Sequence, residues 1–303
     1  MNNYKYKEQL FLHLDGITVI PVILAIKKIG VLNFLEKKES FTLSEIEDEF
    51  KINKGYFSIA LRTLLSVGLL KIEEENISTT TYIINHKQLN LFVKAIDCDN
   101  EILELMNIYI DLKGTIENTN PLTKNNLELL KNILIILENK KKLFLDNQNS
   151  RNEEDIYYFI EGIIIGPLLS YIGYYNLSKE DIRNDDLRLY IEKLFKLSNF
   201  INSEGEFTEK GLFFKKRLAS YGVTSSYLPL LISLESIILK NTNIVWERDQ
   251  KGNEIHVNRG MNVWGSGGAH KYYFDHIDKI IIDIFNKELD QQPKGIIDVG
   301  CGD

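Results

Sequence analysis

Hydrophobic positions in the first seventy residues recur at helical spacing. Over residues 54–67 they lie three and four apart, which predicts an amphipathic helix. A Thr42-x-x-Glu45 capping box predicts a shorter helix just before it. Gly68 is expected to end the second helix as a left-handed cap. The predicted buried face of this helix consists of Phe57, Ala60, Leu61, Leu64 and Leu65.

A two-stranded wing is predicted after these helices. Its strands, 69–72 and 77–84, are separated by the acidic turn Glu73-Glu74-Glu75-Asn76. Two helices followed by a wing predict a winged helix within residues 1–87. Winged helices can bind DNA, but the second helix here offers only Lys54 and Arg62, and the carboxylates of the wing tip would repel phosphates. The sequence therefore favours a winged helix that does not bind nucleic acid.

Residues 88–180 are predicted to form a helical insert. Apolar residues repeat at helical spacing through 88–113 and again through 123–146. The apolar stretch 156–177 is long enough to span a membrane, and Glu161 is its only charged residue. Because it also contains several glycines and tyrosines, we interpret it as a buried, kinked helix or two half-helices.

Residues 181–257 are predicted to form a second winged-helix-like unit. They weakly repeat the order of the first unit: the end of a helix, a short apolar strand, an acidic turn and a return. Helices are predicted at 211–221 and 228–240, and a hairpin is predicted over 244–257 with its turn at 249–252.

Composition and charge narrow the class of protein. A chain of 303 residues can hold two or three compact units. Its net charge of −7 argues against a general nucleic-acid surface. Cys98 and Cys301 lie far apart in the sequence, which predicts no disulfide framework and a cytoplasmic location. Residues 1–9 lack the pattern of a signal peptide.

The last nine residues, 295–303, combine a strand pattern with a glycine-rich turn. An apolar run from Ile296 to Val299 predicts a buried β-strand, and Gly300-x-Gly302 follows at once. Glycines let a backbone turn tightly and approach a ligand that a Cβ would push away. This order is typical of the first strand and loop of a nucleotide-binding α/β domain.

Asp298-x-Gly300-x-Gly302 resembles the first motif of class I S-adenosylmethionine (SAM) methyltransferases, written E/D-x-G-x-G-x-G. The resemblance implies that Asp298, Gly300 and Gly302 belong to the loop that holds the amino-acid end of SAM. The family's third glycine would be residue 304. A doubly wound SAM domain needs further strands and helices after this loop, so we expect the chain to be the N-terminal part of a longer methyltransferase or a truncated relative.

Residues 258–270 are rich in glycine and contain Trp264. They could form a backbone nest for an anion at a helix N-terminus, or a flexible hinge between two domains. A helix predicted from about 269 to 286 follows. This segment together with the terminal motif looks like the methyltransferase domains of bacterial polyketide synthases, some of which bind a single metal ion. The resemblance implies that Trp264, Gly267, His270 and Tyr273 border the cofactor.

The winged helix adds a second resemblance. Residues 61–70 are similar to the N-terminal dimerisation domain of small-molecule O-methyltransferases. This resemblance implies that the chain forms a homodimer and that the winged helix forms part of the wall of the substrate pocket.

His270 could contact cofactor, substrate or metal, or it could be a surface residue. Asp275, His276 and Asp278 are interpreted as a solvated helix face, because neighbours on a helix point in different directions.

The predicted fold is mainly α with small β wings, ending in the first strand of a Rossmann-like SAM domain, with residues 258–303 forming a lid helix and the first strand and loop. The resemblances imply SAM-dependent C- or O-methylation of a small-molecule or carrier-bound substrate of polyketide type, by a homodimer or within a larger synthase. The sequence identifies no catalytic base and no membrane anchor. The alternative is a non-catalytic winged-helix module for docking or dimerisation.

Overall fold

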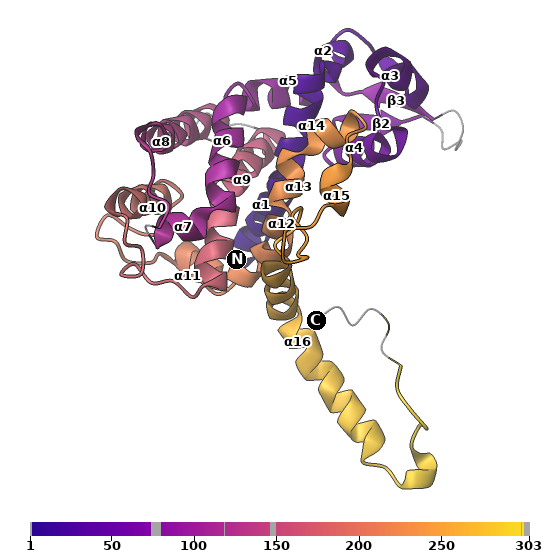
Figure 1. Ribbon diagram of the computed structural model, residues 1–303, viewed down its shortest axis with the longest axis vertical. Coiled ribbons are helices and arrows are strands. Elements are labelled where there is room, and N and C mark those ends of the chain that lie inside the picture. Colours follow the sequence, from indigo (N-terminus) through magenta and orange to yellow (C-terminus); the bar gives the residue numbers. More distant parts are fainter. Residues whose placement is uncertain (1, 74–79, 118, 146–149, 298, 300–303) are drawn as a thin grey trace.

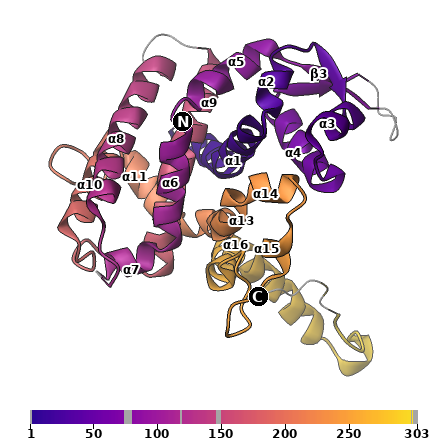
Figure 2. The same ribbon diagram turned by 45° about the horizontal axis from the view of Figure 1, so that its top comes forward.

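The computed structural model describes residues 2–73, 80–117, 119–145, 150–297 and 299. Two long helices, α1 (Asn2–Ile29) and α9 (Arg151–Tyr174), pack against each other at its centre (Figures 1 and 2). Gly16 and Gly162 face each other across this contact. A Cβ on Gly162 would overlap the backbone of His13, and a Cβ on Gly16 would overlap the backbone of Phe159. The two glycines therefore set the distance between the helices.

Both central helices are long and apolar enough to cross a membrane. However, 72% and 83% of their most apolar windows are buried inside the protein. Such burial is typical of core helices, and it agrees with the interpretation of residues 156–177 as a buried helix. α9 is one continuous helix that passes through Pro167, not two half-helices.

The N-terminal region contains the predicted two helices and a small sheet. Thr42 caps α3 (Leu43–Phe50) with Glu45 in a complete capping box, as predicted, and Gly68 follows α4 (Lys54–Ser66) with φ at 71°. The sheet is antiparallel with the order β1-β3-β2. Its strands are β1 (Ser40–Thr42), β2 (Leu70–Ile72) and β3 (Thr81–Ile84), and α2 (Val31–Leu35) precedes them. Residues 74–79, which include most of the predicted wing tip, lie outside the described residues.

The middle of the chain is helical, with more breaks than the periodicity predicted. The single helix expected over 88–113 is divided at residues 96–98 and 111. The helix expected over 123–146 is present as α8, and the Thr123 side chain caps its start. The helices of this region are α5 (His86–Ala95), α6 (Asp99–Ile110), α7 (Leu112–Ile116) and α8 (Lys124–Phe144).

The second unit has less β-structure than predicted. Its expected wing is reduced to one bridge between Ile201 and Phe207. The predicted hairpin over 244–257 was wrong, because 243–246 form a helix and only Arg248 and Glu254 pair across the turn. The helices here are α10 (Asp185–Leu197), α11 (Glu209–Lys215), η1 (Leu218–Tyr221), α12 (Gly222–Ser226), α13 (Leu228–Ile232), α14 (Leu234–Ile238) and α15 (Asn243–Trp246).

The last long helix, α16 (Arg259–Phe285), starts against the body and then projects away from it (Figure 1). After the short helix η2 (Leu289–Gln291), the chain returns along this arm. Residues 295–297 form no strand, so the prediction of a buried strand was wrong for these residues. A strand needs a neighbour to bond its backbone groups, and the described residues place none beside it.

Candidate functional site

The predicted cofactor residues of the glycine-rich segment lie on α16, and those of the terminal motif lie outside the described residues. Trp264 and Gly267 are on the first half of the helix, and His270 and Tyr273 follow on the projecting half. Nothing is described of Asp298, Gly300 and Gly302, so their role stays a prediction. The structure therefore describes only the four predicted cofactor residues of the glycine-rich segment.

The prediction of a nest or a hinge at residues 258–270 was wrong, because Asn258 caps α16 and the helix runs on through these residues from Arg259. Tertiary packing explains why so many glycines occur inside a helix. A Cβ on Gly265 would lie 2.7 Å from Gly222 Cα and 2.6 Å from the backbone nitrogen of Val223. A Cβ on Gly268 would lie 2.6 Å from Ala219 Cβ. The small residues let α16 lie directly against α12 and η1, and this contact compensates for the low helix propensity of glycine.

Trp264 is half-buried where α16 crosses the end of α9. Its indole meets the ring of Tyr174 edge to face, with centroids 5.7 Å apart. A Cβ on Gly173 would lie 2.7 Å from the indole, and one on Gly222 would lie 2.9 Å from it. Two glycines thus form the surface on which Trp264 packs. Trp264 also lines a cavity.

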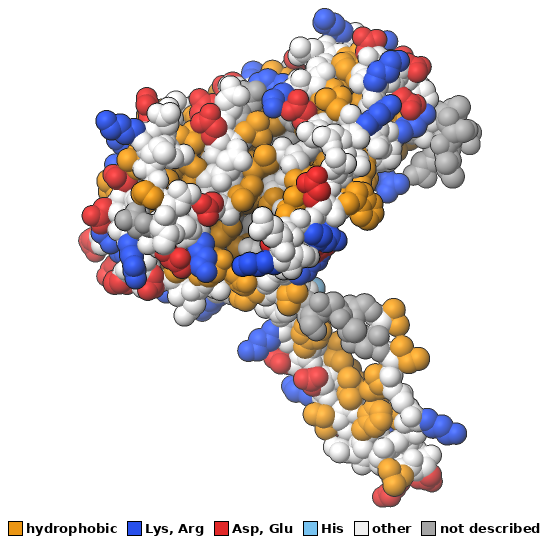
Figure 3. Space-filling model, in the orientation of Figure 1, with side chains coloured by type: hydrophobic (Ala, Val, Ile, Leu, Met, Phe, Trp, Pro, Cys, Tyr) orange, Lys and Arg blue, Asp and Glu red, His pale blue; other side chains and the backbone are white. Residues whose placement is uncertain are grey.

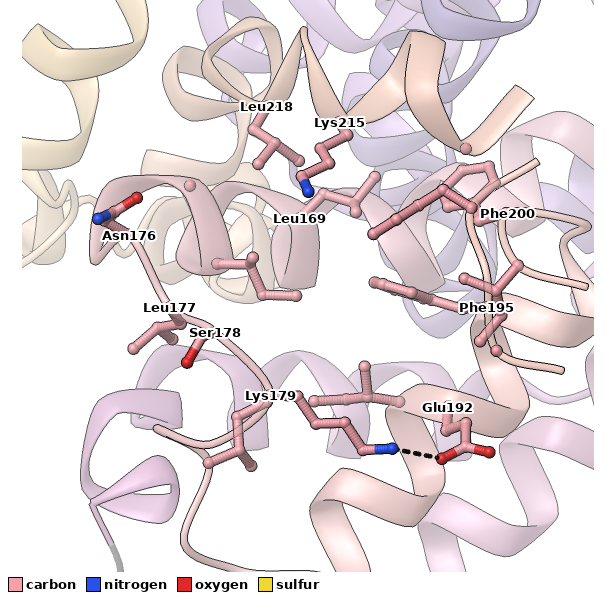
Figure 4. A pocket seen from close by; sticks show the side chains of 18 of the residues that line it. Leu169, Asn176, Leu177, Ser178, Lys179, Glu192, Phe195, Phe200, Lys215 and Leu218 are labelled. Carbon is pink, nitrogen blue, oxygen red and sulfur yellow. Dashed lines mark hydrogen bonds and ion pairs between the residues drawn. The ribbon is translucent and has the colours of Figure 1, made fainter. Parts of the chain in front are cut away.

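The cavity has a volume of about 760 Å³. Figure 4 shows it between α9, α10 and the segment that carries Lys215 and Leu218. Apolar side chains dominate its walls, with charged groups among them. Its volume falls within the range of small-molecule sites. The apolar lining includes Leu169, Ile172, Ile191, Phe195, Phe200, Leu218 and Trp264.

His270 and Tyr273 lie on the exposed part of α16. His270 Nδ1 is 3.5 Å from Ser266 Oγ, one turn earlier, and its ring approaches Tyr273 and Phe274. Nδ1 of His276 lies 2.8 Å from the carbonyl oxygen of Tyr272. Among the residues that the structure describes, no three metal-ligating side chains come together. The described part of the chain therefore holds no candidate metal centre.

A buried polar cluster joins α1, α9 and α11, and the sequence pattern did not predict it. Its centre is the carboxylate of Glu161, which is 1% exposed. Glu161 Oε2 lies 2.9 Å from His13 Nε2 and accepts a hydrogen bond of 2.7 Å from Gln9. Tyr157 donates to Oε1 at 3.1 Å, and the Lys210 ammonium lies 3.8 Å from Oε2. The available signal was Glu161 itself, a lone charge in a long apolar stretch.

The imidazole of His13 links this carboxylate to Tyr221. The Nδ1 atom lies 2.7 Å from the Tyr221 hydroxyl. Burial lowers the pKa of His13 below its usual 6.5, against the opposing effect of Glu161. Burial alone would raise the pKa of Glu161, but the charge of Lys210 and the hydrogen bond from His13 lower it to about 2. At neutral pH, a neutral His13 therefore donates from Nε2 to ionised Glu161 and accepts at Nδ1 from Tyr221.

This order of groups resembles a proton relay, but it has no access to a substrate. His13 and Tyr221 are 0% exposed, and no described cavity is lined by His13, Glu161 or Tyr221. The cluster instead ties α1, α9, α11 and η1 together by directional bonds. We assign it to the architecture of the core rather than to catalysis.

Three segments of the chain match models of protein families. Residues 6–72 match the AprA N-terminal domain, residues 161–241 the AprA winged helix domain, and residues 254–303 the AprA MT2-like domain. No curated protein matches the chain in sequence. The matches relate the chain to methyltransferase-associated domains and support a mainly α protein with a winged helix.

The boundaries of the family matches can be compared with the elements of the structure. The winged-helix match covers α10, α11 and η1, where the described residues contain one β-bridge, whereas the three-stranded sheet lies in the N-terminal part. The match to the MT2-like domain begins just before α16 and contains both the glycine-rich segment and the terminal motif. α16 therefore lies inside the methyltransferase-related segment, and its first half packs against the helical body.

Proposed function

We propose that this chain belongs to a SAM-dependent methyltransferase and forms its helical and winged-helix part together with the entry into the SAM domain. The observation that carries the proposal is the match of residues 254–303 to a methyltransferase-like domain. This segment contains Asp298-x-Gly300-x-Gly302 directly after an apolar run. SAM would supply an electrophilic methyl group to a nucleophilic carbon or oxygen.

The residues of this chain would act mainly by binding and positioning. The glycines of the terminal motif would let the backbone approach the amino-acid end of SAM, and Asp298 would offer a carboxylate to its ammonium group. Trp264 and the rest of the glycine-rich segment would fix α16 beside the cofactor domain. Correct placement of two reactants can account for a large part of a rate enhancement.

Exposure of the terminal segment supports a conformation in which more structure covers it. The side chains of Ile296 and Ile297 are 55% and 89% exposed. Both are apolar and belong to the run that precedes the motif, so they are suited to pair and pack within an α/β sheet. We therefore place SAM binding in a form of the protein in which this run is covered.

The proposed substrate is a small molecule or an acyl group on a carrier, methylated in the cytoplasm by a homodimer or within a larger synthase. Neither a nucleic acid nor a membrane is proposed as a partner. The second candidate function is a docking or dimerisation module without catalysis. The observation that favours it is the row of exposed apolar side chains on the projecting half of α16, among them Phe274, Ile277 and Ile280.

Calorimetric titration of SAM tests the proposal. The chain would be compared with a form extended by the coding sequence that follows residue 303, with Gly300→Val in each. We expect the extended form to bind SAM and Gly300→Val to abolish binding, because the added side chain blocks the approach of the backbone. Gly295→Val is the matched control, since it makes the same change before the apolar run and outside the Gly300-x-Gly302 motif.

Two results would contradict the proposal. One is the absence of SAM binding by either form, which would favour the docking module. The other is equal loss of affinity in Gly295→Val and Gly300→Val, which would show that the motif has no special role.

A further inference from the structure

We propose that the cavity between α9, α10 and α11 binds an amphiphile that consists of an apolar chain and one anionic head group. The cavity lies almost entirely within residues 169–219, and only Trp264 comes from the methyltransferase-related segment. Binding at this site does not require SAM or the terminal motif. The inference is therefore independent of the proposed methyl transfer.

The walls suit an apolar chain. α9 contributes Leu169 and Ile172, α10 contributes Ile191 and Phe195, and Trp264 contributes from α16. A cavity of about 760 Å³ would hold water against these walls if it had no ligand. Transfer of an alkyl chain from water to such walls stabilises a complex by about 0.8 kcal/mol for each buried methylene group.

The charges around the cavity favour an anion. Four cations line it, Lys179, Arg188, Lys215 and Lys216, against two carboxylates, Glu192 and Glu204. This local excess of positive charge differs from the net charge of −7 of the whole chain. Electrostatic attraction would therefore select an anionic head group.

Lys215 is the cation best placed to meet that head group. Lys179 pairs with Glu192 at 3.1 Å, and Arg188 pairs with Asp185. Within the described part of the chain, neither Lys215 nor Lys216 forms an ion pair, and the Lys215 ammonium lies 4.6 Å from the centre of the Phe207 ring. Figure 4 shows the Lys215 side chain extending over the hollow between Leu218 and Leu169. Its charge is thus presented at the edge of the apolar walls.

The test uses the complete chain and three probes with the same ten-carbon tail. These are decanoate, decyl phosphate and decanol, and calorimetry measures the affinity of each. We expect at least one anionic probe to bind more tightly than decanol. Comparison of decanoate with decyl phosphate distinguishes a carboxylate ligand, such as a fatty acid, from a phosphate-bearing one.

Variants locate the site. Lys215→Glu should weaken the anionic probe about fivefold to tenfold, since it replaces attraction with repulsion, and it should leave decanol unchanged. Lys131→Glu on α8 is the matched control and should have no effect. Leu177→Trp, which fills part of the cavity, should weaken all three probes. In Trp246→Phe, Trp264 is the remaining tryptophan, and its emission should change as the cavity fills.

Three results would overturn the inference. They are the absence of binding by every probe, equal affinity for decanol and both anions, and equal effects of Lys215→Glu and Lys131→Glu. Binding without any change in Trp264 emission would place the ligand elsewhere and would also overturn it.

Discussion

At the scale of single residues, Glu161 shows how a charge is accommodated in an apolar helix. Its carboxylate accepts hydrogen bonds from Gln9 and Tyr157 and lies beside His13 and Lys210. A buried carboxylate without such partners would be strongly destabilising. Because the partners come from three helices, loss of one of them would affect the packing of all three.

The cluster predicts that stability falls as the pH is lowered. The native pKa of His13 is below 6.5, so the unfolded chain binds a proton there that the native chain does not, and stability decreases below pH 6.5. The native pKa of Glu161 is about 2, below its ordinary 4.5, so its contribution is complete above pH 4.5 and decreases as the pH falls towards 2. Thermal unfolding between pH 7 and pH 4 should show a decreasing Tm.

His13→Gln tests whether His13 causes the decrease in Tm at the higher end of this pH range. The glutamine keeps a hydrogen-bonding side chain but cannot titrate, so the slope of Tm between pH 7 and pH 5.5 should become smaller. His276→Gln on the exposed part of α16 is the control, and it should keep the wild-type slope. Identical slopes in all three proteins would show that His13 does not control this range.

At the scale of elements, glycine at the crossing of α12 and α16 determines how closely these helices pack. Gly265→Val would force them apart, because its side chain would overlap Gly222 and Val223. We expect a loss of about 1–3 kcal/mol in the free energy of unfolding. The emission of Trp264 should shift to the red as its contact with Tyr174 opens. Denaturant unfolding and fluorescence in a Trp246→Phe background measure both effects.

Gly55→Ala provides the comparison for this prediction. Its Cβ would meet only the Asn53 side chain, at an ordinary distance of 3.4 Å, in the first turn of α4. Alanine is the better helix former, so this variant should be as stable as the wild type or slightly more stable. An equally stable Gly265→Val protein would mean that the two helices do not depend on this contact.

The same crossing shows where prediction from the sequence reached its limit. The Thr42–Glu45 capping box and the helix before Gly68 were correctly predicted, because their signals are local. The glycines of residues 258–270 predicted a nest or a hinge instead of a helix, because no local signal reveals that Gly222 lies opposite Gly265. The buried cluster was missed for the same reason, since His13 and Glu161 are 148 positions apart in the chain.

At the terminal motif, the sequence and the structure differ for another reason. Ile296 and Ile297 have the apolar character of a core strand, but they are exposed and unpaired among the described residues. A strand forms only when its neighbours are present. The prediction of site residues in the motif therefore depends on structure that covers them.

At the scale of the whole molecule, the projecting arm contrasts with the well-packed body. Figure 3 shows hydrophobic side chains along the arm, below the body. Ile277 and Ile280 are 48% and 59% exposed, and Tyr273 is 63% exposed. Exposed apolar surface of this extent is typical of an interaction site. The arm is thus the part of the chain whose surface is least suited to water.

We expect copies of this chain to associate in a concentration-dependent way through their apolar arms. Ile277→Lys combined with Ile280→Lys should abolish this association, because lysine keeps the helix and removes the apolar surface. Sedimentation velocity over a range of concentrations measures the change.

Asn286→Lys with Gln291→Lys adds the same charge at exposed polar positions and should associate like the wild type. The Tm of both double variants should stay unchanged, since these side chains lie away from the core. If the Ile277→Lys and Ile280→Lys variant associates as strongly as the wild type, the arm is not the contact surface.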